Sequence, residues 1–99
     1  MAYEKGSFDA AIAAAAGDDF TLREELLRSY GESLLSQIDL LARARCDGNW
    51  HMAARRLEQL GASFHCGTLV HLAGQAIEGA PGDPVVLREL RQYAAGFSA

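Results

Sequence analysis

A chain of 99 residues has the length of one small domain, so we expect a single domain over residues 1–99 and no separate catalytic domain. About half of the residues are apolar, yet no apolar run approaches the roughly 18 residues needed to cross a bilayer. The net charge of −4 disfavours nucleic-acid binding, because neutralising phosphates requires a basic surface. Glu4, Asp9 and the lack of a basic leader argue against a secretory signal, so we expect a cytoplasmic location.

The apolar residues recur at helical spacing and β-branched residues are few, which predicts an all-α chain. The first predicted helix is short: Ser7 can cap it, and Gly17 ends it after Ala16. Its alanine content favours helix but leaves little area to bury. We expect this helix to pack as an arm against the rest of the chain.

The next helix is predicted to be long. Thr21 followed by Glu24 matches a capping box, and the helix should continue to about Arg45, roughly 37 Å at 1.5 Å per residue. Its apolar residues repeat at intervals of three and four, namely Leu22, Leu26, Tyr30, Leu34, Ile38 and Leu41. This helix should be the spine of the fold, and residues 47–49 (Asp-Gly-Asn) should form the turn that follows it.

The third predicted helix runs from about Trp50 to His65 and is amphipathic. One face carries mainly apolar residues, which are Ala53, Leu57, Leu60, Gly61 and Phe64. The residues expected to point mostly outward are Arg55, Arg56, Glu58, Gln59 and Ala62. Trp50 either seals the end of the fold over Leu41 and Ala53 or lies exposed as an interface anchor.

Two further helices complete the predicted fold. Gly67 should break the third helix, and Thr68 can cap a fourth helix that ends near Gly79. Its inward residues should be Leu69, Leu72, Ala73 and Ala76. After a loop at 79–83, Pro84 suits the first turn of a last helix lined by Val86, Leu90, Tyr93 and Phe97. Short loops between the four main helices predict an antiparallel up-down four-helix bundle.

The two cysteines, Cys46 and Cys66, flank the third predicted helix. About 20 helical positions at 1.5 Å each would hold them roughly 30 Å apart, which is far beyond disulfide reach. We therefore expect free thiols, in keeping with a reducing compartment.

Four arginines lie close together in the sequence of this acidic chain: Arg43, Arg45, Arg55 and Arg56. Such a local positive patch is either a solvated face or a docking surface for an acidic partner.

The segment from Gly17 to Tyr30 resembles the opening of a histidine-containing phosphotransfer (HPt) domain, in which a Gly-Asp turn leads into a long helix with a leucine pair and then an aromatic residue. HPt domains continue with a helix bearing the pattern A-H-x-L-K-G-S, then a Gly-Ala turn and a helix of the form L-x-x-L-A. An ungapped alignment matches the apolar positions of this pattern with Ala54, Leu57, Phe64, Leu69, Leu72 and Ala73. The resemblance extends from about Ser7 to Phe97 and implies the same bundle with a short extra N-terminal helix.

This chain departs from the HPt pattern at the residue that carries phosphate. In one alignment register Arg55 stands at the histidine position, with Glu58 at the lysine and Gln59 at the glycine. A second register, shifted by three residues to match Trp50 with a common HPt tryptophan, puts Glu58 at the histidine position and Ala62 at the glycine. Neither register supplies a histidine, and the sequence alone leaves both open.

The chemistry of HPt domains depends on this histidine, so its absence determines which function the resemblance implies. Their histidine presents a neutral imidazole nitrogen to an aspartyl phosphate, and a small residue one turn away lets the partner approach. Arg cannot replace that nucleophile because its guanidinium stays protonated. The resemblance therefore implies a phosphorelay protein that binds a response-regulator receiver domain or a histidine kinase without carrying phosphate. We expect a monomer without enzymatic activity or cofactor, whose partner-binding residues are Arg55, Arg56, Glu58, Gln59 and Ala62.

Two alternative functions remain open. The chain could be an active phosphocarrier that uses a non-standard histidine, for which His51 is the best placed because Arg55 follows one turn later. It could also be a helical interaction domain unrelated to phosphorelay. A metal site is not expected, since His65, Cys66 and His71 match no familiar zinc spacing.

Overall fold

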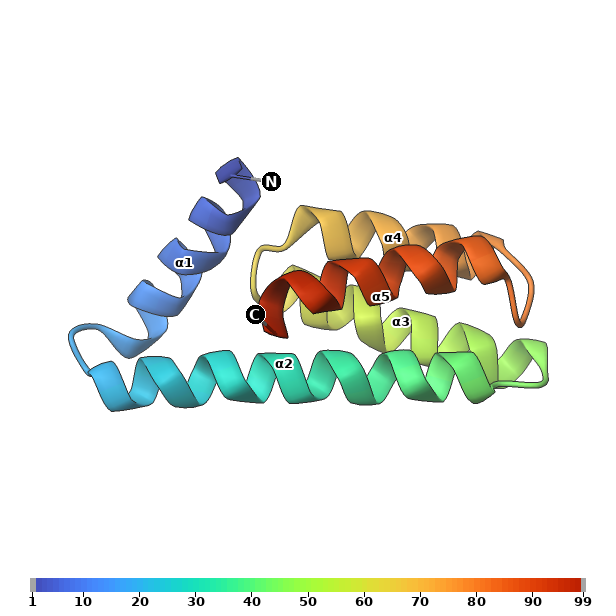
Figure 1. Ribbon diagram of the computed structural model, residues 1–99, viewed down its shortest axis with the longest axis horizontal. Helices are drawn as coiled ribbons and strands as arrows, with labels where there is room; N and C mark the ends of the chain where they lie inside the picture. Colours follow the sequence, from blue (N-terminus) through green and yellow to red (C-terminus); the bar gives the residue numbers. More distant parts are fainter. Residues whose placement is uncertain (1, 99) are drawn as a thin grey trace.

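The computed structural model describes the backbone of residues 2–98 and the side chains of residues 8–96. Five helices follow one another along this part of the chain, and it contains no strand (Figure 1). Their bounds are α1 Ala2–Ala16, α2 Phe20–Arg43, α3 Asp47–Ser63, α4 Gly67–Glu78 and α5 Pro84–Ser98. The prediction of an all-α chain is confirmed.

Helix α1 is longer than the sequence predicted. It begins at Ala2, so Ser7 lies within the helix and is not its N-cap; the side chain of Ser7 lies outside the described side chains. No proline interrupts residues 2–16, so nothing forces the helix to start later. It ends as predicted, with Gly17 in the left-handed conformation at φ 61°. Phe8 and Ile12, four residues apart, are both buried.

Helix α2 is capped by Asp19 and not by the predicted Thr21. The Asp19 carboxylate accepts a hydrogen bond from the Leu22 backbone N–H at 3.0 Å, the usual contact of an N-cap side chain. Thr21 and Glu24 both lie inside the helix and are exposed. The helix ends at Arg43, two residues before the predicted end, because Ala44 is extended with ψ 132°.

The predicted apolar stripe of α2 is buried in its second half only. Tyr30, Leu34, Ile38 and Leu41 are buried, whereas Leu26 is half-buried and Leu22 is 37% exposed. Figure 1 gives the reason: the first turns of α2 extend past the ends of α3 and α5 and meet only α1. Side chains on these turns find fewer neighbours, and Phe20 is 71% exposed there.

The turns around α3 differ from the predicted ones. Asp47, Gly48 and Asn49 form the first turn of α3, so the connection from α2 is only 44–46. An acidic residue in the first turn suits the positive end of a helix dipole. Gly67 begins α4 and does not act as a breaker, and Thr68 lies inside the helix, since Cys66 holds the N-cap position. The left-handed residue of this connection is His65, at φ 56°.

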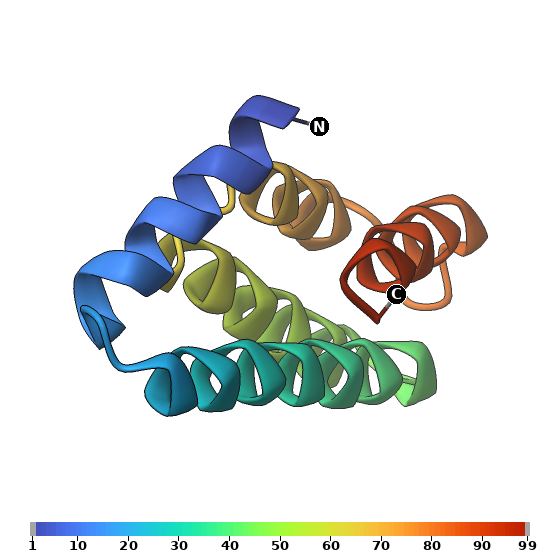
Figure 2. The same cartoon turned by 60° about the vertical axis from the view of Figure 1, so that its left-hand side comes forward.

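The helices pack into a bundle around one apolar core. Helix α2 contacts α3 and α5, α4 contacts the same two helices, and α1 lies against α2. Figure 2 shows α3 between α2 and α4, with α1 crossing the end of the bundle. All the predicted inward residues of α4 are buried, as are Val86 and Leu90 of α5. Tyr93 is half-buried, and the predicted packing of Phe97 lies outside the described side chains.

Trp50 belongs to the core. Its side chain is fully buried, and its indole Nε1 donates a hydrogen bond to the Ala76 carbonyl oxygen of α4 at 2.6 Å. A buried indole with a satisfied N–H is a structural element of the bundle. The alternative of an exposed interface anchor is therefore wrong.

Candidate functional site

The candidate site is the outward face of α3, and the apolar periodicity of this helix determines which residues reach it. Trp50, Ala54, Leu57 and Gly61 recur at intervals of three and four and are buried together with Ala53, which lies beside this stripe. At 100° per residue, the opposite face must then point away from the core.

The predicted partner-binding residues occupy this face. Arg55, Arg56, Gln59 and Ala62 are exposed, and Glu58 is half-buried. Arg55 and Gln59 lie one turn apart, as do Glu58 and Ala62, so both alignment registers draw their two key residues from the same side of α3. The predicted placement of these residues on an outward helix face is confirmed; their role in binding stays a prediction.

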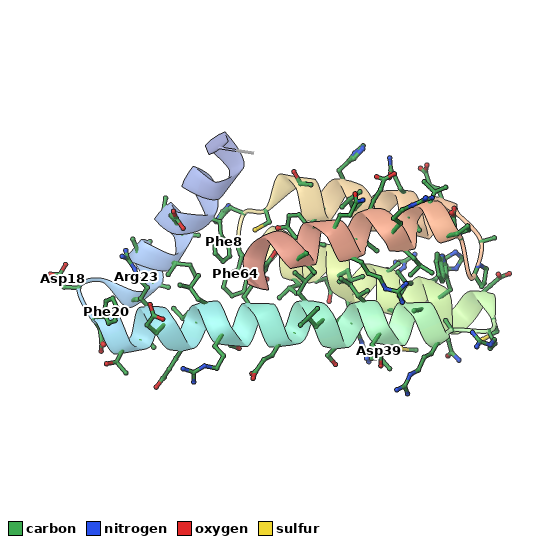
Figure 3. All side chains as sticks on the ribbon, in the orientation of Figure 1. Phe8, Asp18, Phe20, Arg23, Asp39 and Phe64 are labelled. Atoms are coloured by element: carbon green, nitrogen blue, oxygen red, sulfur yellow. The ribbon has the colours of Figure 1, made fainter. Side chains whose placement is uncertain are left out.

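The arginines of this face carry unneutralised charge. Within residues 8–96, neither Arg55 nor Arg56 makes an ion pair. The ion pair found among these residues joins Arg43 Nε to an Asp39 carboxylate oxygen at 3.2 Å, one turn apart on α2. Asp39 points away from the bundle (Figure 3). The structure thus divides the arginine patch: Arg43 is paired, whereas the two arginines of α3 present their charge to solvent.

Arg45 lies in the connection after α2, whereas Arg55 and Arg56 belong to α3. Its guanidinium Nη1 donates to the Arg43 carbonyl oxygen at 3.2 Å. A cation at the C-terminal end of α2 complements the unpaired carbonyl groups and the negative end of the helix dipole. Arg45 therefore stabilises a helix end.

The three histidines lie outside the centre of the site. His51 is half-buried in the first turns of α3, one turn before Arg55. His65 is exposed in the connection between α3 and α4. His71 is exposed on α4, where its Nε2 lies 3.2 Å from Gln75 Nε2. No histidine therefore occupies the middle of the α3 face.

The two cysteines are free, as predicted: Cys46 is exposed and Cys66 is fully buried. Across the described residues, no group of three or more His, Cys, Asp or Glu side chains is placed to hold a metal ion. No helix in that part of the chain is both long and apolar enough to cross a membrane.

An aromatic cluster that the sequence did not single out lies at the junction of α1 with the bundle. Phe8 and Phe64 point toward each other there (Figure 3). The Tyr30 ring lies 4.8 Å from each of the other two rings, and the Phe8 and Phe64 rings are 5.9 Å apart. These separations are typical of favourable aromatic pairs. Periodicity could show that each residue points inward, but not that α1, α2 and the end of α3 bring them together.

Tyr30 also forms the polar contact of this junction. Its hydroxyl lies 2.8 Å from the Tyr93 hydroxyl of α5. Burial raises the pKa of Tyr30 well above its ordinary value, and hydrogen bonds with Cys66 and Tyr93 raise it further. Tyr30 therefore stays neutral at any physiological pH and joins α2 to α5.

A shallow groove lies beside the exposed arginines of α3, and no pattern in the sequence indicated it. It has a volume of about 310 Å³ and runs between the end of α2 and the beginning of α3. Leu40 and Met52, both exposed apolar residues, line it. Arg56 lines it too, so the adjacent Arg55 and Arg56, 100° apart around the helix, serve different parts of the surface.

No family model matches this chain, and no curated protein or solved structure is significantly similar to it.

Proposed function

We propose that this chain is an HPt-like protein of two-component or phosphorelay signalling that binds a receiver domain or a histidine kinase without carrying phosphate. The observation that carries the proposal is the centre of the exposed α3 face, where the HPt resemblance expects histidine and this chain has Arg55. A guanidinium that is permanently protonated cannot attack an aspartyl phosphate. The partner would therefore meet a recognisable shape and no acceptor.

The proposed fold is the antiparallel up-down four-helix bundle of HPt domains, formed by α2 to α5, with α1 as the extra N-terminal helix. The cyclic set of contacts, α2 with α3, α3 with α4, α4 with α5 and α5 with α2, supports it. So do the connections, which are three to five residues long and favour antiparallel neighbours.

The turn after α3 also supports the first alignment register. HPt domains have a Gly-Ala turn at this point, and here the chain has His65 followed by Cys66. His65 adopts φ 56°, a conformation that favours glycine, and Cys66 is fully buried like a small core residue. We therefore propose Arg55, not Glu58, as the residue at the histidine position.

The electrostatics of the site suit an acidic partner. A receiver domain presents an acidic pocket, and Arg55 and Arg56 are exposed and unpaired within residues 8–96. Complementary charge of this kind mainly accelerates association and selects partners. Gln59 and Ala62 would form the polar and small-residue contacts around the arginines.

The alternative of a phosphocarrier that uses His51 is less well supported. His51 is half-buried, and a nucleophile must reach into a partner's active site. The third possibility, a helical interaction domain outside phosphorelay, shares the same exposed face and differs only in its partner.

A phosphate-transfer assay separates the first two functions. The protein is incubated with each receiver domain of the source organism after charging with acetyl phosphate, and phosphohistidine is sought by mass spectrometry at neutral pH. We expect none. Phosphate that appears on the wild type and is abolished by His51→Gln would establish the carrier and refute the proposal.

A binding assay tests the docking face. Arg55→Glu should weaken binding of a receiver, mainly by slowing association, and the wild-type affinity should fall as salt rises. Arg88→Glu, at an exposed arginine of α5, makes the same charge change elsewhere and is the matched control. Surface plasmon resonance at two ionic strengths measures the association and dissociation rates of each variant. Equal binding by Arg55→Glu and wild type would show that another surface meets the partner.

A further inference from the structure

The groove between α2 and α3 is a second candidate surface, distinct from the centre of the α3 face. Its volume of about 310 Å³ lies at the lower end of the range for ligand pockets, about 300 to 1,000 Å³. It is lined by Leu40 and Arg43 of α2, by the C-cap residue Ala44, and by Asn49, Met52, Ala53 and Arg56 of α3. Space of this size accommodates one or two side chains of a partner.

The floor of the groove and the walls formed by Leu40 and Met52 are apolar, whereas Asn49 adds a polar side chain to the lining. Ala44 and Ala53 are almost fully buried and form the floor, while Leu40 is 44% exposed and Met52 is 50% exposed. Exposed large apolar side chains that converge on a hollow mark interaction sites more often than scattered ones do. Methionine is flexible and polarisable, so Met52 can adapt to an inserted side chain.

The rim of the groove is basic. Arg43 and Arg56 lie on it, and no acidic residue lines it. Asp39 neutralises part of the Arg43 charge through the 3.2 Å ion pair, but both side chains of this pair are largely exposed and can exchange partners. Arg56 makes no ion pair within residues 8–96. Although the chain has a net charge of −4, these two arginines create a local positive potential around the groove.

We propose that this groove binds an acidic amphipathic helix of a partner protein. One leucine-like side chain of that helix inserts between Leu40 and Met52, and carboxylates beside it face Arg43 and Arg56. Helix-in-groove recognition uses apolar anchors at spacings of three and four residues, which fits a hollow for one or two side chains. The inference does not rest on the proposed function, although Arg56 belongs to both surfaces.

A matched pair of peptides tests the proposal. Both are 16-residue alanine-based helices with two leucines one turn apart; the first carries four glutamates around the leucines, and the second carries lysines in their place. Each is titrated into the ¹⁵N-labelled full chain and followed by NMR. We expect the acidic peptide to shift the amides of Leu40, Ala44, Met52, Ala53 and Arg56, and to bind at least about tenfold more tightly than the basic peptide.

Variants at exposed positions keep the fold intact and locate the binding. Met52→Glu should weaken the acidic peptide about tenfold or more, because it removes an apolar wall and adds a repelling charge. Val85→Glu is the matched control, since Val85 is an apolar residue of α5 with 52% exposure and lies outside the groove. It should change the affinity less than about twofold.

Four outcomes would overturn the proposal. These are no binding of the acidic peptide, equal binding of both peptides, shifts confined to other elements, and equal loss in Met52→Glu and Val85→Glu. A concentration-dependent dimer in sedimentation that Met52→Glu abolishes would assign the groove to a second copy of the chain instead. Because no receiver domain is used, these results are independent of those that test the proposed function.

Discussion

Among the described glycines, Gly61 has the closest neighbours, and they belong to α4. A Cβ at this position would lie 3.0 Å from the Val70 backbone nitrogen and 3.1 Å from the Leu69 Cβ. The first of these atoms belongs to the α4 backbone and cannot move without shifting the helix. Gly61 is thus required by packing, even though glycine costs about 1 kcal/mol in a helix interior.

Replacing Gly61 with alanine should therefore destabilise the protein. The overpacking cost of about 1 to 3 kcal/mol, less a gain in helix propensity of about 1 kcal/mol, leaves a net loss of up to about 2 kcal/mol. Gly31 in α2 is the matched control, since a Cβ there meets nothing within 4 Å. Gly31→Ala should stabilise by about 0.5 to 1 kcal/mol. Chemical denaturation measures both, and a stabilising Gly61→Ala would mean that α3 and α4 are not in close contact.

Tyr30 should make the stability of the protein sensitive to alkaline pH. Burial, with the hydrogen bonds to Cys66 and Tyr93, raises its pKa in the folded state above the ordinary value of 10.0. Above about pH 10 the unfolded chain loses the phenolic proton while the folded chain keeps it, so the unfolded state becomes favoured. The free energy of unfolding should fall by about 1.4 kcal/mol per pH unit from this group alone.

Denaturation curves between about pH 8 and 11 measure this slope, and Tyr30→Phe is the control because it removes the titrating group. The variant should show a shallower decline above about pH 10 and no difference in slope below about pH 9. Identical slopes for the two proteins would show that the Tyr30 hydroxyl is open to water.

At the scale of elements, one face of α3 packs in the core and the opposite face carries the candidate site. Its buried stripe contacts both α2 and α4, and its indole N–H at Trp50 bonds to the α4 backbone. Its other face carries the arginines. Since a helix is rigid over this length, the buried face determines the direction in which Arg55 projects. A change in the core should disturb the site only when it unfolds or tilts α3.

Leu57, on the buried stripe of α3, provides the test of this element. Its side chain has 0% exposure, so Leu57→Ala should destabilise by about 2 to 5 kcal/mol. Gln59→Ala, two residues along on the exposed face, should change stability by less than about 0.5 kcal/mol. Thermal and urea unfolding give both values. A loss below about 1 kcal/mol for Leu57→Ala would contradict the burial of this face.

At the scale of the whole molecule, the bundle supplies a rigid scaffold for two neighbouring surfaces of α3. The arginine face and the apolar groove share Arg56 and differ in every other residue. The local positive charge lies on a chain of net charge −4, so steering of an acidic partner would be directed to this side and weakened by salt.

Restoring a nucleophile would test whether the shape of a phosphotransfer domain is retained. Arg55→His combined with Gln59→Gly places an imidazole on the exposed α3 face and clears its surroundings one turn away. We expect this double variant to accept phosphate from a charged receiver that the wild type binds, measured as acid-labile phosphate. The single change Arg55→His should accept less, because Gln59 still obstructs the approach. A double variant that binds the receiver but stays unphosphorylated would refute the proposed register.

Apolar periodicity identified the four main helices, most of the core and the outward direction of the candidate site residues, because burial of one helix face repeats every 3.6 residues. The first helix was predicted from its alanine content and from Gly17 at its end. It located the helix ends poorly at α1, α2 and α3. A cap depends on which side chain reaches a free backbone N–H, and Asp19 reaches it where Thr21 does not. The spacing of apolar residues cannot show which of several neighbouring polar residues forms the cap.

Only the tertiary structure brought separate segments together. The contact of Phe8, Tyr30 and Phe64, the bond from Trp50 to Ala76 and the groove between Leu40 and Met52 all join residues from different helices or, for Phe64, from the end of one. The sequence predicts the face of each helix, but which faces meet depends on the packing angles and on close approaches such as that at Gly61. Surfaces formed by two helices therefore exist only once the bundle has assembled.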